Sequence, residues 1–149
     1  MNPAEAAAAF EVVHPLGGVD GKGEPFPTLY WLCDEALRRA VADLERCGWI
    51  KRLEEKARAD AAFAAALAAD HRRYAAARWA MLDKDQRAAC EGRGWGAALR
   101  DRGVGGVADF TKVKCLHAHV AHALADRASD SEVVNAVGAW ALARLGVRA

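Results

Sequence analysis

A nine-residue segment, Lys114 to His122, concentrates side chains that bind metals or act in nucleophilic catalysis. It reads KCLHAHVAH and holds one Cys and three His, whereas the rest of the chain has three Cys and two His. Zinc sites are commonly built from Cys thiolates and His imidazoles, and a Cys beside a His also forms a nucleophile–base pair. The segment therefore predicts a metal site or a cysteine–histidine catalytic site.

The three His of this segment do not share one face if residues 110–126 form a single helix. At about 100° per residue, Cys115, His119 and His122 lie on one stripe, with spacing i, i+4, i+7. His117 falls on the opposite side, which predicts a packing residue, a support for the ligands or an additional ligand. The eleven residues that begin with Cys115 carry no formal charge, and a helix uncharged all round is usually buried. We therefore expect the stripe to face the interior or a cleft.

A second dense motif, PFPTLYWLC at residues 25–33, ends in Cys33. Two Pro restrict the backbone, and the aromatic run supplies a large apolar mass. Cys33 directly precedes Asp34 and a helical pattern, so it is a possible helix N-cap. Because the stripe on residues 115–122 is short of ligands for a closed tetrahedral site, we predict that Cys33 is the remote ligand.

These residues leave three interpretations open. In the first, Cys33, Cys115, His119 and His122 bind Zn²⁺, or alternatively iron as Fe²⁺ or in an Fe–S cluster. Four protein ligands would make a closed structural site, and three would leave a position for water or a substrate. In the second, Cys115 or Cys33 is a metal-free nucleophile with a neighbouring His, His117 included, as its base. In the third, the chain is a non-enzymatic helical interaction module with the Cys/His cluster in its core.

Helices must position both motifs. A helix is predicted over 34–48, where large apolar residues recur at i, i+4 and i+7. Residues 51–92 are predicted to form an Ala-rich helical excursion, because Ala has high helix propensity but adds little apolar mass. Further helices are expected over 110–126, with Asp109 or Thr111 as N-cap, and over 129–145.

The N-terminal part differs from the rest. Residues 1–9 are expected to form a helical or frayed tail. Two β-prone runs within residues 10–31 flank a Gly/Pro-rich connection with a turn expected at Asp20–Gly21, which indicates a hairpin or extended arm. The predicted fold is therefore mainly α: one helical-bundle domain over residues 1–149 with a short N-terminal extended arm or β-hairpin.

Composition narrows the class of partner. The formal net charge is +1, whereas nucleic-acid binders usually carry a strongly basic face. The basic run at 72–78 is expected to be a solvated helix face, and His71 a surface residue. Lys112, Lys114 and the Gly-rich loop 103–106 would favour a small anionic ligand near the helix start. The sequence identifies no other partner, and it leaves open whether the chain associates with a second copy of itself.

The sequence shows neither a signal peptide nor a membrane-spanning run. The first residues lack the basic region of a signal peptide, and no run approaches the roughly 18 apolar residues of a membrane span. These features predict a cytoplasmic protein without a membrane segment. In that compartment the four Cys are expected to be thiols or metal ligands rather than disulfides.

Four segments together resemble a bacterial family catalogued as domain of unknown function 501. They are GEPFPTLYWLC at 23–33, VGGV at 104–107, VKCLHAHVAHALA at 113–125 and, as a weaker match, NAVG at 135–138. The segments span most of the chain, except for the Ala-rich middle. The resemblance implies that the two Cys-containing motifs belong to one design, and it implies no particular chemistry.

The chain departs from that family in two places. Relatives have a Cys-Pro pair after LYWL, whereas here Cys33 is followed by Asp34. Relatives also carry an Arg-Cys-Pro stretch near the N-terminus, where this chain has AAAFEVVHP and no Cys. If that Cys is a ligand in relatives, His14 is in the right region to replace it.

Overall fold

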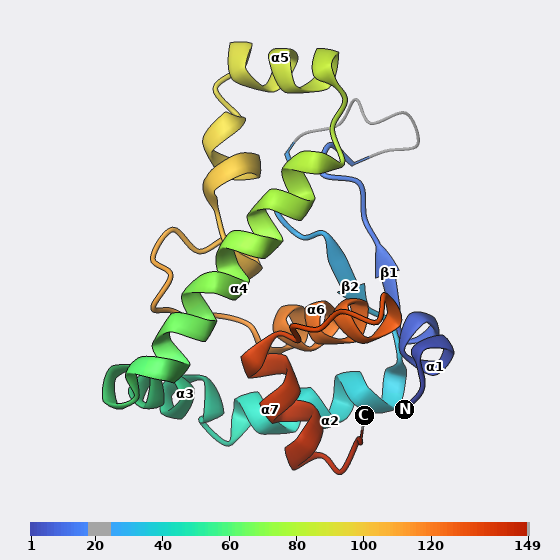
Figure 1. Cartoon of the computed structure of the whole chain (residues 1–149), viewed down its shortest axis with the longest axis vertical. Coiled ribbons are helices and arrows are strands. Elements are labelled where there is room, and N and C mark those ends of the chain that lie inside the picture. The colour runs from blue at the N-terminus through green and yellow to red at the C-terminus, as the bar shows by residue number, and fades with distance from the viewer. Residues whose placement is uncertain (18–24, 149) are drawn as a thin grey trace.

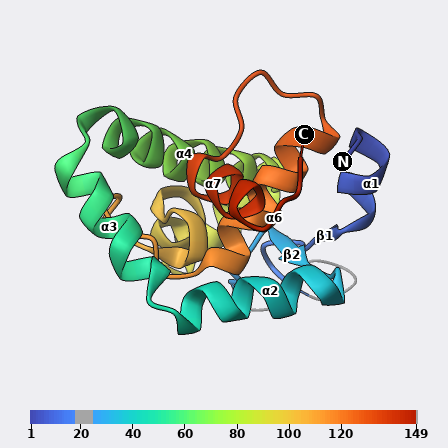
Figure 2. The same cartoon turned by 90° about the horizontal axis from the view of Figure 1, so that it is seen from below.

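Helix α6 (Leu116–Ala128) is the central element of the fold. The computed structural model describes residues 1–17 and 25–148, and α6 is buried along most of its length. Helix α7 (Ala136–Arg144), α1 (Pro3–Ala8), α2 (Glu35–Arg46) and strand β2 (Tyr30–Leu32) all contact it. Seen from below, α6 and α7 lie in the middle, with α4 (Ala61–Ala80) on one side and α2 on the other (Figure 2). The predicted mainly α single domain, with its uncharged helix at the centre, is confirmed.

A two-stranded antiparallel sheet covers one end of α6. Strand β1 (Phe10–Val12) pairs with β2 so that Phe10 lies opposite Leu32 and Glu11 opposite Trp31. The predicted β-hairpin is therefore confirmed. The turn expected at Asp20–Gly21 lies outside the described residues.

The N-terminal residues form a capped helix rather than a frayed tail. The side chain of Asn2 accepts a hydrogen bond from the backbone of Glu5, whose own side chain bonds back to the Asn2 backbone. This capping box satisfies helix-end N–H groups. Ala6 and Ala9 are buried in the main core, and the terminal ammonium donates to the carbonyl of Arg148, so the two ends of the chain meet (Figure 1).

Aspartate side chains cap the N-termini of three further helices. Asp34 caps α2, Asp60 caps α4 and Asp83 caps α5 (Lys84–Gly92), as expected for residues whose oxygens accept the first free N–H groups of a helix. Helix α3 (Trp49–Ala59) follows α2 after Gly48, whose φ of 83° suits glycine. The predicted helix over 34–48 thus agrees with α2, but its N-cap is Asp34 and not Cys33.

Helix α4 crosses the whole molecule and is more than an excursion. It runs from α3 to α5, which stands at the far end from α2 and α7 (Figure 1). Its buried residues include His71, Tyr74 and Arg78. The guanidinium of Arg78 is fully buried and donates to three backbone carbonyls, those of Pro27, Leu99 and Arg102. The expected surface position of His71 is wrong, because its ring binds loop backbone inside the protein. The face expected to be solvated at 72–78 is solvated only in part, since Arg72 is exposed whereas Arg78 is buried.

The remaining elements connect α5 to α6. A π-helical turn, η1 (Ala97–Asp101), and a 3₁₀ turn, η2 (Val104–Gly106), precede a short irregular segment before α6. Leu16, Leu82, Cys90 and Leu99 form a small second cluster under α5. All four Cys are free thiols. None of the described helices combines the length and the apolar character that a membrane crossing requires.

Candidate metal centre

Three side chains from α2 and the start of α6 converge at one point. They are Glu45 in the last turn of α2, Cys115 at the N-cap of α6 and His117 in its first turn. One donor atom from each, a carboxylate oxygen, Sγ and a ring nitrogen, lies within 4.8 Å of the other two. Carboxylate, thiolate and imidazole are the three protein donors that Zn²⁺ accepts.

The ring of His117 is held by the backbone of α2. Its Nε2 lies 3.1 Å from the carbonyl oxygen of Arg38, and because a carbonyl only accepts, Nε2 carries the proton. Its Nδ1 lies 2.5 Å from Glu45 Oε1. A metal-binding His typically donates its other N–H to a carbonyl in this way, which fixes the tautomer and the ring orientation. Nδ1 is therefore the nitrogen available to a metal.

The imidazole of His117 favours its protonated form. A hydrogen bond with Cys115, assisted by the Arg38 carbonyl and the charge of Glu45, outweighs burial and raises the pKa of His117 to about 9. At neutral pH the ring therefore carries a proton on Nδ1. A metal ion that binds this group must displace that proton, as is usual for sites with Cys and His ligands.

Cys115 reaches the group because the helix starts later than its sequence pattern predicts. Lys114 has a φ of 60°, and Cys115 is extended, with φ −143° and ψ 114°. Residues 110–114 are therefore turn and irregular backbone, and neither Asp109 nor Thr111 caps α6. The predicted stripe of Cys115 with His119 and His122 assumes a helix through Cys115, whereas α6 begins at Leu116 and the Cys115 donor atom lies near those of Glu45 and His117.

The VGGV loop supports this turn. A Cβ placed on Gly105 would lie 3.7 Å from the Cβ of Cys115, so the two backbones are close neighbours. Gly105 itself has a φ of 71°, which favours glycine. Two of the segments that carry the family resemblance thus meet at the candidate centre.

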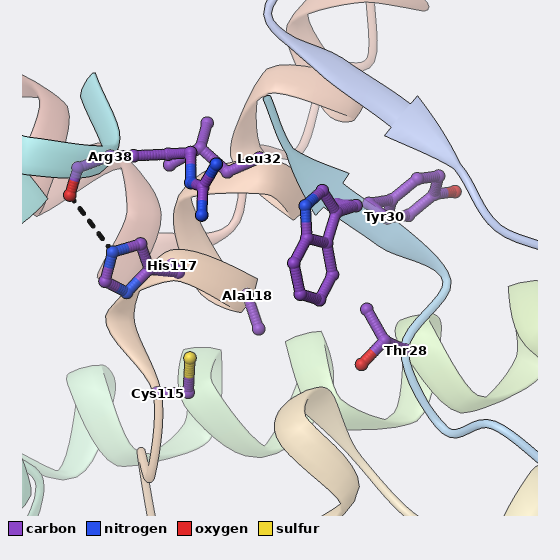
Figure 3. A pocket seen from close by; sticks show the side chains of 8 residues that line it. Thr28, Tyr30, Leu32, Arg38, Cys115, His117 and Ala118 are labelled. Atoms are coloured by element: carbon purple, nitrogen blue, oxygen red, sulfur yellow. Dashed lines mark hydrogen bonds between the residues drawn. The ribbon is translucent and has the colours of Figure 1, made fainter. Parts of the chain in front are cut away.

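A cavity of about 300 Å³ opens beside Cys115 and His117 (Figure 3). Its walls come from the end of the PFPTLYWL motif, from α2 and from the start of α6. They comprise Thr28, Tyr30, Trp31, Leu32, Arg38, Cys115, His117 and Ala118. In Figure 3 the guanidinium of Arg38 points into this space, and Trp31 also lines it. A metal held by Cys115 and His117 would therefore adjoin a space large enough for a small ligand.

The two other His of the segment lie in a separate, buried network. His119 is fully buried and its Nδ1 lies 3.2 Å from Asn135 Oδ1, while Asn135 Nδ2 lies 3.0 Å from His122 Nδ1. Gly138 N also donates to Asn135 Oδ1, at 2.8 Å, which orients the amide. Burial lowers the pKa of His119 to about 3 and that of His122 to about 4. Both rings are therefore neutral and bind α6 to α7.

The same network continues to α4. Arg73 donates to Asp70 and to both carboxylate oxygens of Asp126. His71 Nδ1 accepts from the backbone of Val104, and its Nε2 lies 2.8 Å from the Lys112 carbonyl oxygen. The polar groups of this region are thus used to connect helices and loops.

The remaining residues of the predicted site lie outside the converging group. Cys33 points to α1, with its Sγ 3.7 Å from the carbonyl oxygen of Ala8. His14 Nδ1 accepts from the backbone of Leu16. Lys114 is exposed. Metal binding by Cys33, His119 and His122 stays a prediction, and the structure brings only Cys115 of the predicted four together with His117.

Sequence reasoning missed Glu45 and Arg38. A weak signal was present, since Arg38 and Glu45 are seven residues apart on a predicted helix and so share a face. That face could not be matched to Cys115 from the sequence, because the approach of α2 to α6 is a tertiary contact.

Comparison with known proteins supplies a family and no activity. The chain matches no curated protein and no protein of solved structure. Residues 3–143 match the family described as protein of unknown function, DUF501. The match covers the hairpin, the candidate centre and the buried histidine network, and the chain therefore belongs to the DUF501 family.

Proposed function

We propose that this protein binds Zn²⁺ through Glu45 Oε1, Cys115 Sγ and His117 Nδ1. The convergence of three different zinc donors within 4.8 Å carries the proposal. The Arg38 carbonyl supports it, because it holds His117 in the tautomer that a metal requires. The location of the group at the N-terminus of α6 also supports the proposal, since a negative charge such as a thiolate is favoured there.

The arrangement corresponds to a catalytic rather than a structural zinc site. Three protein ligands leave a fourth position open for water or a substrate, whereas structural sites use four. The open position would adjoin the cavity of about 300 Å³. Zn²⁺ lowers the pKa of bound water to about 7 and polarises carbonyl groups. The function that fits is a zinc enzyme acting on a small molecule; Fe²⁺, which accepts the same donors, is the alternative metal.

Metal content of purified protein tests the site. We expect one zinc per chain in anaerobically purified protein, and we expect Co²⁺ to replace it with a thiolate-to-cobalt charge-transfer band. Cys115→Ser should abolish that band and the bound zinc. Cys33→Ser is the matched control, because Cys33 is a partly buried thiol outside the converging group, and it should retain one zinc.

Two results would contradict the proposal. Wild-type protein that holds no zinc and takes up none on titration excludes the site. Loss of zinc in Cys33→Ser, with full retention in Glu45→Gln, would instead favour the ligand set predicted from the sequence. A visible charge-transfer spectrum in protein as isolated, with iron found by elemental analysis, would identify iron as the metal.

The proximity of Cys115 to His117, whose donor atoms lie within 4.8 Å of each other, favours a second candidate function. A Cys beside a His is the nucleophile–base arrangement of cysteine enzymes. In this case, protein stripped of metal with a chelator should react with iodoacetamide faster at Cys115 than at exposed Cys47. His117→Ala should remove this difference in reaction rate. A tightly bound stoichiometric metal that requires Cys115 would exclude this candidate.

A further inference from the structure

Arg38 contributes to the candidate centre in two separate ways. Its backbone carbonyl holds His117, and its side chain lines the cavity. The neighbouring Arg39 is paired with Glu35 at 2.5 Å. No carboxylate pairs with the Arg38 guanidinium among residues 1–17 and 25–148. Arg38 thus presents an uncompensated charge with a planar set of donors to the cavity.

Trp31 presents an apolar surface to the same space. Its side chain is 46% exposed although it belongs to the hairpin that covers α6. It lines the same cavity as Arg38, and Leu32 and Ala118 complete an apolar wall. A large exposed aromatic ring at the edge of a cavity is available to stack on a flat ligand.

The charge of the loaded centre also favours an anion. The thiolate of Cys115 and the carboxylate of Glu45 would together balance the two charges of Zn²⁺, and His117 would be neutral. The charge of Arg38 then remains, and among the described residues that line the cavity it is the only formally charged side chain besides the metal ligands. A monoanion would neutralise it.

We infer that the cavity binds a small planar carboxylate, with its carboxylate on Arg38 and its flat part on Trp31. Guanidinium binds carboxylate through two parallel hydrogen bonds. The volume of about 300 Å³ suits an aromatic acid of benzoate size. A phosphate monoester carries nearly two charges, and the mostly apolar wall offers too few donors for it. The inference rests on the proposed function, because it places this ligand beside the open position of the zinc site.

Titration with benzoate tests the inference. Calorimetry on zinc-loaded wild-type protein should show saturable binding, and the neutral analogue benzamide should bind at least about tenfold more weakly, since a charged hydrogen-bonded pair is lost. Arg38→Gln keeps the backbone carbonyl that holds His117 and should weaken benzoate binding by about tenfold or more. Trp31→Leu should weaken it by about threefold to tenfold through loss of stacking.

Arg39→Gln is the matched control, since it removes the neighbouring charge on the same helix and leaves Arg38 in place. Benzoate affinity within about twofold of wild type is expected. Equal losses in Arg38→Gln and Arg39→Gln would overturn the inference, as they would indicate a general field of α2. Binding of inorganic phosphate in preference to benzoate would also overturn it.

The zinc content of each sample separates this inference from the proposed function. Zinc that is retained in all samples, with no benzoate binding by wild-type protein, overturns the carboxylate ligand and leaves the metal site intact. Absence of zinc from wild-type protein overturns the metal site, and with it the placement of the ligand beside a metal. Thermal melts of Arg38→Gln and Trp31→Leu establish that a loss of binding occurs in folded protein.

Discussion

Helix α6 carries two groups of histidines that differ in almost every physical respect. His117 lies in the first turn, beside a cavity, and shares its position with a thiol and a carboxylate. His119 and His122 follow within two turns, are buried, and meet at the amide of Asn135. Tyr30 adjoins both environments, because it lines the cavity and also stacks on His122 at 5.8 Å between centroids.

The two groups respond to protons in opposite directions. The hydrogen bond with Cys115 and the charge of Glu45 raise the pKa of His117 to about 9, while burial lowers the pKa of His119 to about 3. A histidine that is already neutral and held by an amide contributes to packing. A histidine that keeps a displaceable proton next to other donors can exchange it for a metal. The surroundings of each ring, and not the density of His in the sequence, therefore identify the site.

The largest expected effect is on stability, from Asn135→Ala. The amide of Asn135 bonds both buried histidines and caps α7 through Gly138 N. Its removal leaves two ring nitrogens and one helix N–H without partners, at about 1–3 kcal/mol for each buried group. We expect the free energy of unfolding to fall by about 4 kcal/mol in urea denaturation.

Asp34→Ala is the control for this change, because it removes a helix cap that touches neither group. A loss of about 1 kcal/mol is expected from the cap alone. Equal losses in the two variants would mean that the histidine network adds nothing to stability. Zinc bound by the folded fraction of Asn135→Ala should equal that of wild type, since the two groups have separate roles.

The second largest effect is a loss of stability in acid. The folded pKa of His122 is lowered to about 4 from an ordinary value of 6.5, so the unfolded chain takes up the proton first as the pH falls below about 6.5. The contribution of His122 to the free energy of unfolding is therefore lost as the pH falls from about 6.5 toward about 4. Between about pH 7.5 and about pH 5 the loss amounts to roughly 2 kcal/mol.

Denaturation of wild type and His122→Gln at several pH values checks this. The variant should lose less stability in acid, and the difference between the two curves isolates His122, because His117 and the carboxylates titrate in both proteins. Parallel curves would show that His122 does not titrate as a buried neutral ring.

The sequence predicted the fold more completely than the site. Apolar periodicity identified α2 to within a residue or two, and the uncharged run identified α6 as the central helix. The N-terminal hairpin was predicted from its β-prone runs. These features depend on local patterns. The burial of Arg78 was not predictable, because its partners are loop carbonyls far along the chain.

Of the four ligands predicted from the sequence, Cys115 lies in the converging group, beside Glu45 and His117. A helical wheel assumes a continuous helix, and the φ of 60° at Lys114 interrupts it. A Lys in this conformation has no clear sequence signature, since positive φ is rare for residues other than Gly, Asn and Asp. Glu45 comes from a helix whose register against α6 depends on packing, so no local pattern connects it with Cys115.

A smaller effect is expected on zinc affinity from Glu45→Gln. The amide keeps the size of the side chain and loses the charge, so zinc affinity should fall by at least about tenfold, or about 1.4 kcal/mol. The free energy of unfolding of the metal-free protein should fall by no more than about 1 kcal/mol, because the pair of Glu45 with His117 is partly exposed.

Asp43→Asn is the matched control in the same helix, since its carboxylate pairs with exposed Arg46 outside the group. It should retain wild-type zinc affinity in a competition titration with a chelating dye. Unchanged affinity in both variants would remove Glu45 from the ligand set and leave Cys115 and His117 in need of another donor.

The smallest effect is expected from Lys114→Gly. The φ of 60° at Lys114 costs about 1 kcal/mol for a residue with a Cβ, and glycine relieves this cost while adding entropy to the unfolded chain. We expect a net stabilisation of about 0.5 kcal/mol in urea denaturation, with unchanged zinc content. Asp130→Gly is the matched control beyond the other end of α6, where Asp130 has a φ of 54°; it should stabilise the protein less, because Asp tolerates this conformation better than Lys does. A loss of zinc in Lys114→Gly alone would show that the turn before Cys115 must be rigid to present its thiol, which would sharpen the contrast with the buried histidines further along the same helix.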